Sequence, residues 1–209
     1  AKGEVVAVQL PNIVEFVVAY LAITSRGAVM QTLHMPYRAA ELSTLLAHSG
    51  AVCAIVMAQA KDYAAAQVVN ALQPRLPALR HVIAVGPGAL PADAMPFDGL
   101  VADAHTNDAE PAPVARSGSD PFLLLYTSGT TSAPKGVPHA YQNFLSNSRL
   151  SAAELSVGVD DVLLSAAPFT HLYGLFTFNM ALATGATTLL LPAFSPPDLA
   201  RLMHEARPT

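Results

Sequence analysis

Short apolar or β-branched runs alternate with helical patterns along this chain, and that alternation constrains the fold more than any other feature. The strand-like runs of the first half occupy residues 5–10, 28–33, 51–57 and 81–85. The helical patterns between them begin near residue 12 and then cover 41–49 and 61–72. Strands joined by helical crossovers pair in parallel, with the helices covering the sheet. The sequence therefore predicts an α/β fold of layered, mostly parallel sheets covered by helices.

Local signals place the ends and faces of the first two helices. Asn12 followed by Glu15 is typical of a helix start, and Gly27 predicts its end. In the second helix an apolar face is expected to point inward, and Gly50 is expected to terminate it. The residues of the predicted apolar faces are Val14, Val17, Val18 and Leu21 in the first helix and Leu42, Leu45 and Leu46 in the second.

The second half repeats this architecture after a stretch without sustained periodicity. Residues 86–119 are rich in Ala, Pro, Gly and Asp and are predicted to form a long surface connection. Strands are then expected at 122–126, 162–166 and 187–191, and helices at 141–155, 175–184 and 197–206. We therefore expect two α/β subdomains, residues 1–119 and residues 120–209, the second carrying the loop described below and being truncated.

Charge and cysteine content exclude several classes of function. The net charge is −4 and only 12% of residues are charged, without runs, so nucleic acid and anionic membrane surfaces are not expected partners. The longest apolar stretch, residues 16–23, is far shorter than the roughly 20 residues of a membrane span. The single cysteine, Cys53, lies in an apolar run and is interpreted as a buried structural thiol, which favours a reducing cytoplasm. The histidines show no ligand spacing, so no metal site is expected.

One loop concentrates hydroxyl groups directly after an apolar strand. The segment from Thr127 to Thr131 holds four hydroxyl residues around Gly129, and Lys135 follows. Phosphate oxygens are bound by backbone N–H groups, hydroxyls and a cation, all of which this segment offers. The glycine and lysine are spaced as in a Walker A loop, but Pro134 and Gly136 break that motif. Because proline disfavours helix around it, Lys135 is expected on an extended segment and not at a helix N-terminus.

Read as a string, TSGTT followed by PKGV resembles the signature loop of the acyl-adenylate-forming superfamily, which includes acyl-CoA synthetases, luciferases and the adenylation domains of peptide synthetases. The opening Pro11-Asn12 with Glu15-Phe16 is similar to the same family's first helix. The resemblance implies that Lys135 is catalytic and that six residues hold the β- and γ-phosphates of ATP. These are Thr127, Ser128, Gly129, Thr130, Thr131 and Lys135.

A second segment, APFTHLYG at residues 167–174, resembles the family motif that lines the acyl pocket. The resemblance implies that His171 and Gly174 contact the substrate, with the imidazole at a strand end facing the pocket. The alternative is that His171 is a core histidine. Two departures from the family pattern are Ser132, where a glycine is usual, and Tyr141, where a histidine is common. If the glycine has a positive φ, serine there costs on the order of 1 kcal/mol.

The resemblance implies part of an ATP-dependent acid–thiol ligase, most similar to acyl-CoA synthetases of fatty acid metabolism. Such an enzyme uses ATP, Mg²⁺ and coenzyme A to convert a carboxylic acid into acyl-AMP and then a thioester. The family's adenine site, acidic Mg²⁺ residue and C-terminal domain are expected beyond residue 209, so the 209-residue chain is expected to be inactive alone. The alternatives are a peptide-synthetase adenylation domain and a non-catalytic nucleotide-binding relative. The acid and the oligomeric state are left open.

Overall fold

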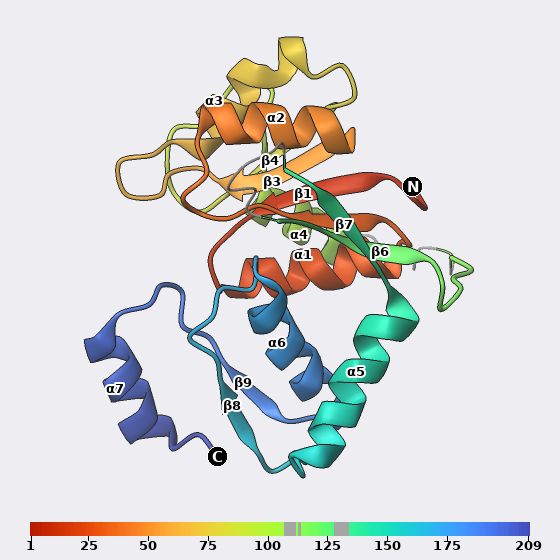
Figure 1. Ribbon diagram of the computed structural model, residues 1–209. Coiled ribbons are helices and arrows are strands. Elements are labelled where there is room, and N and C mark those ends of the chain that lie inside the picture. Colours follow the sequence, from red (N-terminus) through yellow and green to blue (C-terminus); the bar gives the residue numbers. More distant parts are fainter. Residues whose placement is uncertain (107–111, 113, 128–133) are drawn as a thin grey trace.

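The computed structural model describes residues 1–106, 112, 114–127 and 134–209, and the statements below concern those residues. Seven strands form one sheet in the order β5-β4-β3-β1-β2-β6-β7 (Figure 1). Their bounds are β1 Val5–Gln9, β2 Val29–Thr32, β3 Cys53–Met57, β4 His81–Val85, β5 Met95–Pro96, β6 Pro121–Tyr126 and β7 Gly136–Ala140. Pairing is parallel from β5 to β6, and β7 alone runs antiparallel, against β6. The predicted fold class is confirmed.

Helices cover both faces of this sheet. α2 (Ala39–Ser49) and α3 (Ala65–Leu72) lie on one face, and α1 (Val14–Ser25) and α4 (Phe97–Thr106) on the other (Figure 1). A short 3-10 turn, Gln73–Arg75, follows α3. The first face buries Leu42, Leu45 and Leu46 of α2, as predicted, and Gly50 ends that helix in the left-handed conformation.

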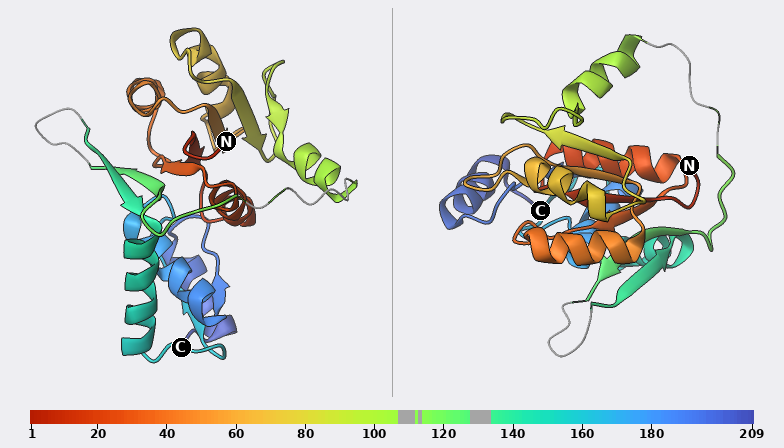
Figure 2. Two further views of the ribbon diagram at one scale, coloured as in Figure 1. Left: turned by 90° about the vertical axis from the view of Figure 1, so that its right-hand side faces the viewer. Right: turned by 90° about the horizontal axis from the view of Figure 1, so that it is seen from above.

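The remaining elements lie below α1 in the view of Figure 1. They are α5 (Tyr141–Glu154), α6 (Leu172–Thr184), α7 (Pro196–Ala206) and a two-stranded parallel sheet of β8 (Val162–Leu164) and β9 (Thr187–Leu189). α5 and α6 pack against each other, and Phe169 and Phe178 extend the core beneath α1. Figure 2 shows the β6–β7 hairpin projecting at the opposite side of the sheet from α4. The large sheet thus runs across the expected boundary between residues 119 and 120, because β2 pairs with β6.

The predicted apolar face of α1 is wrong for three of its four residues, since only Val17 packs, partly buried, against the core. Val14, Val18 and Leu21 are 62%, 40% and 46% exposed, whereas the helix buries the stripe Phe16, Ala19, Tyr20, Ile23 and Thr24. Almost every residue of α1 is apolar, so periodicity alone does not select the buried side. The predicted cap is also displaced, because Ile13 occupies the N-cap position and Asn12 bonds elsewhere.

Three elements differ from the sequence-based expectation. α3 begins at Ala65, since Lys61 has a φ of 53° and cannot continue a right-handed helix. The stretch 86–119 contains β5 and α4, the latter anchored by the buried Phe97. β7 lies between the predicted strand 122–126 and the predicted helix 141–155, where no strand was expected. No helix in the described part of the chain is both long and apolar enough to cross a membrane.

Candidate active site

The β6–β7 hairpin presents the hydroxyl-rich loop, defined here as residues 127–135. β6 ends at Tyr126 and β7 begins at Gly136, and the backbone N–H of Thr127 donates to the carbonyl of Lys135 over 3.1 Å. Thr127 and Lys135 therefore face each other across the root of the loop. Lys135 leads directly into a strand, in agreement with the extended segment expected from Pro134. The other predicted phosphate ligands, Ser128, Gly129, Thr130 and Thr131, lie outside the described residues, as does Ser132.

Two cavities meet at Thr127. The first, called the loop cavity, has a volume of about 420 Å³ and lies between the root of the loop, the segment after β2 and the start of α6. It is lined by Thr32, His34, Tyr37, Leu125, Tyr126, Thr127, Val137, His139, Thr170, His171 and Leu172. The second, called the α2 cavity, has a volume of about 380 Å³ and is bounded by Thr127, Pro134 and residues of α2. The loop thus has space for a ligand on both sides of its root.

A third cavity continues from the loop cavity along α5. This α5 cavity measures about 420 Å³ and shares His139, His171 and Leu172 with the loop cavity. Its wall is mainly apolar and aromatic, with Phe144 and Phe176 among its residues. Concave sites with apolar walls and a few convergent polar groups are typical of small-molecule binding.

His171 lies between these two cavities. It is the N-cap residue of α6, and its Nδ1 accepts a hydrogen bond from the backbone N–H of Tyr173 over 3.2 Å. That bond requires an unprotonated Nδ1, so the neutral ring carries its proton on Nε2. The expectation of a strand end is wrong, because β8 ends at Leu164 and His171 instead starts a helix. His171 is exposed, so it is not the core histidine of the alternative interpretation.

Gly174 lies in the first turn of α6 against the segment that precedes the helix. A Cβ atom at Gly174 would stand 2.3 Å from the carbonyl oxygen of Pro168 and 2.7 Å from that of Ala167. Because Gly174 has no side chain, α6 can lie close to this segment. That close approach positions Leu172, at the start of α6, in the wall of both cavities. The visible role of Gly174 is close backbone packing.

The segment 167–171 is fastened from the opposite end of the sequence by Asn12. Its Nδ2 donates to the carbonyl of Ala167 over 3.0 Å, and its Oδ1 accepts from the N–H of Phe169 over 2.6 Å. Asn12 is 3% exposed. The ring of Phe169 packs against that of Phe16 in α1, with centroids 5.4 Å apart. Asn12 is thus a positioning residue for the segment that ends in His171. The only sequence signal for this role of Asn12 was its presence in the Pro11-Asn12 motif.

His34 and Thr170 also line the loop cavity, and the sequence motifs did not predict them. His34 Nδ1 lies 3.1 Å from Thr170 Oγ1, and the hydroxyl of Thr32 donates to the carbonyl of Thr170 over 2.8 Å. Burial, and next the nearby His171, lower the pKa of His34 below its ordinary value. His34 follows β2, and the carboxyl ends of parallel strands are where ligands of such sheets bind. The position of His34 directly after a predicted strand was the sequence signal that could have identified it as a site residue.

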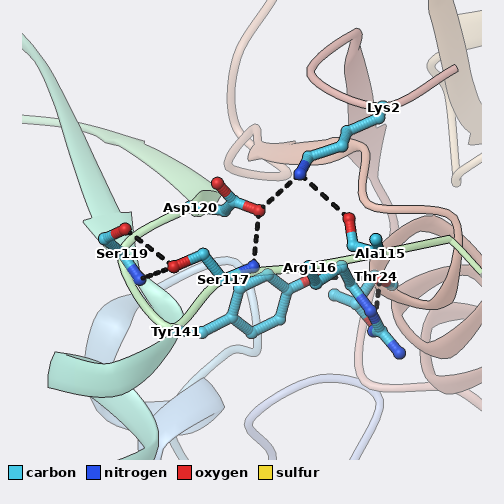
Figure 3. A network of polar contacts seen from close by, with 8 residues as sticks. All are labelled: Lys2, Thr24, Ala115, Arg116, Ser117, Ser119, Asp120 and Tyr141. Atoms are coloured by element: carbon cyan, nitrogen blue, oxygen red, sulfur yellow. Dashed lines mark hydrogen bonds and ion pairs between the residues drawn. The ribbon is translucent and has the colours of Figure 1, made fainter.

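Tyr141 is a structural residue at the far end of β7 from the loop. Its hydroxyl donates to the carbonyl of Thr24 over 2.8 Å, and Arg116 donates to the same carbonyl over 2.9 Å (Figure 3). The Tyr141 ring stacks on Phe122 with centroids 4.5 Å apart. Beside it, Lys2 forms an ion pair with Asp120 at 2.8 Å (Figure 3). These contacts tie the base of the hairpin to α1 through Thr24 and to the N-terminal segment through Lys2.

Two further groups bear on the chemistry. Desolvation raises the pKa of the partly buried Cys53 to about 11, so its thiol is protonated near neutral pH, as a structural cysteine requires. Over the described ranges, no three His, Cys, Asp or Glu side chains gather closely enough to hold a metal ion.

The root of the loop thus lies at one edge of a mostly parallel sheet, beside cavities large enough for a small-molecule ligand. The sequence model of the AMP-binding enzyme family matches residues 1–209, and the chain belongs to this family.

Relatives and solved structures agree with that assignment. The medium-chain fatty-acid–CoA ligase of Escherichia coli is 30% identical over 209 residues, covering 100% of this chain and 36% of the relative. The salicyl-AMP ligase / salicyl-S-ArCP synthetase of Mycobacterium tuberculosis is 35% identical over 196 residues, covering 93% and 34%. The crystal structure of ATP-bound MatB from Rhodopseudomonas palustris superposes with a TM-score of 0.81 at 27% identity, covering 100% of this chain and 39% of that one. The chain thus spans little more than a third of the length of each.

Proposed function

We propose that this chain is the phosphate-loop part of an ATP-dependent acid–thiol ligase that activates a carboxylic acid as acyl-AMP. The observation that carries the proposal is the closed root of the loop, where Thr127 bonds Lys135 between two cavities. The membership in the AMP-binding enzyme family supports the use of ATP.

The proposed reaction proceeds in two steps. A carboxylate oxygen attacks the α-phosphorus of ATP, and the bond to the bridging oxygen breaks, so that pyrophosphate leaves with the electron pair. A thiolate then attacks the acyl carbon, and AMP leaves. The first step shifts negative charge onto pyrophosphate, and a fixed array of donors with one cation stabilises that charge without reorganisation.

We assign Lys135 as that cation and Thr127, Ser128, Gly129, Thr130 and Thr131 as the donors. Mg²⁺ enters this proposal together with ATP, as the counter-ion of the phosphates. The described residues offer no cluster of metal ligands, so no protein ligand of Mg²⁺ is assigned to this chain.

For the acid, we propose the loop cavity and the α5 cavity as its entrance. His171 lies on the boundary of both, and apolar residues such as Leu172 and Phe176 form the wall behind it. Apolar walls bind the acyl group, and a neutral imidazole can donate to a carboxylate without the desolvation penalty of a fixed charge. In this proposal Gly174 contributes by allowing α6 to approach the cavity segment.

The thiol is proposed to be coenzyme A, in line with the match to a fatty-acid–CoA ligase. A thiol on a carrier protein is the second candidate, favoured by the 35% identity to a relative named as both a salicyl-AMP ligase and a salicyl-S-ArCP synthetase.

Pyrophosphate release by the full-length protein, measured with ATP and a panel of aliphatic and aromatic acids, tests the activity. The expected result is release that depends on one class of acid, followed by thioester formation with added coenzyme A or with a phosphopantetheinylated carrier. Absence of acid-dependent release across the panel would refute the proposal. The 209-residue chain alone is expected to be inactive in this assay.

A further inference from the structure

Two histidine rings from distant parts of the sequence lie together in the wall of the loop cavity. His34 comes from the segment after β2, and His171 from the start of α6. Their ring centroids are 6.1 Å apart, and the ring planes are inclined by only 26°. The two rings thus stand nearly parallel beside the root of the hydroxyl-rich loop, where Thr127 lines the same cavity.

The hydrogen bonds fix which nitrogen of each ring carries the proton. His171 Nδ1 accepts from the backbone N–H of Tyr173, so Nε2 is the protonated nitrogen of the neutral ring. His34 Nδ1 lies 3.1 Å from the hydroxyl of Thr170, which is 1% exposed and has no other side-chain partner among the described residues. A buried hydroxyl proton needs an acceptor, so Thr170 donates to His34 Nδ1, and Nε2 of His34 carries the proton as well.

Both rings therefore retain a donor that no described residue uses. Neither Nε2 has a hydrogen-bond partner within the part of the chain that the structure describes. His34 is held in place from behind, because Gln9 Nε2 donates to its carbonyl over 2.9 Å and the Tyr37 ring packs edge-on at 5.2 Å between centroids. The lowered pKa of His34 keeps its ring neutral near pH 7, so it donates without bringing a charge into the cavity.

We propose that His34 and His171 form a two-donor oxyanion site in the loop cavity. Their Nε2–H groups bind two oxygens of one anionic group, either the carboxylate of the acid or a phosphate of the nucleotide beside it. This inference rests on the proposed function, because it places an acid or a nucleotide in that cavity. It assigns to His34 a binding role that the family resemblance does not give it.

Two variants separate the donor from the shape of the ring. His34→Phe keeps an aromatic ring but removes the donor, and His34→Gln keeps an N–H donor that does not titrate. In the full-length protein, His34→Phe is expected to raise one KM by about 10-fold or more, while His34→Gln stays within about 3-fold of the parent. A rise in the KM of the acid identifies the carboxylate as the bound group, and a rise in the KM of ATP identifies the phosphate. His81→Phe is the control, since His81 is exposed on β4.

A spectroscopic measurement on the unmodified protein covers the case in which His34→Phe fails to fold. With ¹⁵N-labelled histidine, the Nε2–H resonances of His34 and His171 are expected to shift together, and saturably, when either pyrophosphate or decanoate is added, while that of His81 does not. Unchanged KM values in a folded His34→Phe, or absence of a joint shift with both probes, would overturn the site. A wild-type protein that releases no pyrophosphate with any acid would instead refute the proposed function.

Discussion

Replacing Asn12 with alanine tests whether one buried side chain fastens the segment that carries His171. Asn12 is 3% exposed and satisfies two backbone groups, the carbonyl of Ala167 and the N–H of Phe169. The substitution leaves the N–H of Phe169 buried without a partner, at a cost of about 1–3 kcal/mol, and removes the bond to the carbonyl of the half-buried Ala167, worth about 1 kcal/mol. We expect Asn12→Ala to lower the free energy of unfolding by about 2–4 kcal/mol in total. For a domain of this size, that corresponds to a fall in Tm of about 5–15 °C.

Urea denaturation followed by far-ultraviolet circular dichroism measures this loss. Asn143→Ala is the matched control, because Asn143 is exposed on α5 and has no side-chain hydrogen bond among the described residues, so its effect should stay within about 0.5 kcal/mol. Hydrogen exchange adds a local readout, since the amide of Phe169 should exchange faster in Asn12→Ala. A loss below about 1 kcal/mol with unchanged exchange at Phe169 would refute the fastening role.

Three further outcomes follow from local geometry. Gly174→Ala should cost about 1–3 kcal/mol of unfolding free energy, because its Cβ would meet the Pro168 carbonyl at 2.3 Å, and wild-type stability in urea would contradict this packing. Cys53 should react slowly with a thiol reagent at pH 8 and rapidly in urea, since burial raises its pKa to about 11; rapid native labelling would show an accessible thiolate. The pKa of His34 is lowered in the folded state, so the unfolded chain binds the proton first, and the free energy of unfolding falls as the pH drops below about 6.5. His34→Gln should reduce this fall, measured by urea titrations at several pH values. An unchanged pH dependence would count against the burial of the ring.

The strands and most helices could be predicted because their signals are local. The apolar run at 81–85 became β4 with the same bounds, and the helix predicted at 141–155 became α5 with one residue fewer. β7 was missed because the loop was expected to run through Pro138, and proline is uncommon inside a sheet. The structure accommodates this proline because β7 is the edge strand of the sheet and pairs only with β6. The missing N–H of Pro138 falls on the outer side of β7, where there is no ladder hydrogen bond to lose.

The site was only partly predictable, because its remaining contacts join residues far apart in the sequence. The motif strings singled out Thr127, Lys135 and His171, which all lie at or near the loop cavity. Asn12 and His34 bond to the segment 167–171, from which they are separated by more than 130 positions in the sequence. No local pattern distinguishes a helix cap from a side chain that bonds across such a separation, so Asn12 was assigned to the wrong partner.

The most direct test of the central claim is ATP–pyrophosphate exchange by the full-length protein and its Lys135→Ala variant, with a substrate acid present. Lys61→Ala, in the exposed turn before α3, serves as the control for removing one positive charge. If Lys135 stabilises the charge on departing pyrophosphate, Lys135→Ala should slow exchange by about 10-fold or more, equivalent to at least about 1.4 kcal/mol, while Lys61→Ala stays at the parent rate. An unchanged kcat and an unchanged KM for ATP in Lys135→Ala would contradict the assignment of the hydroxyl-rich loop to the phosphates.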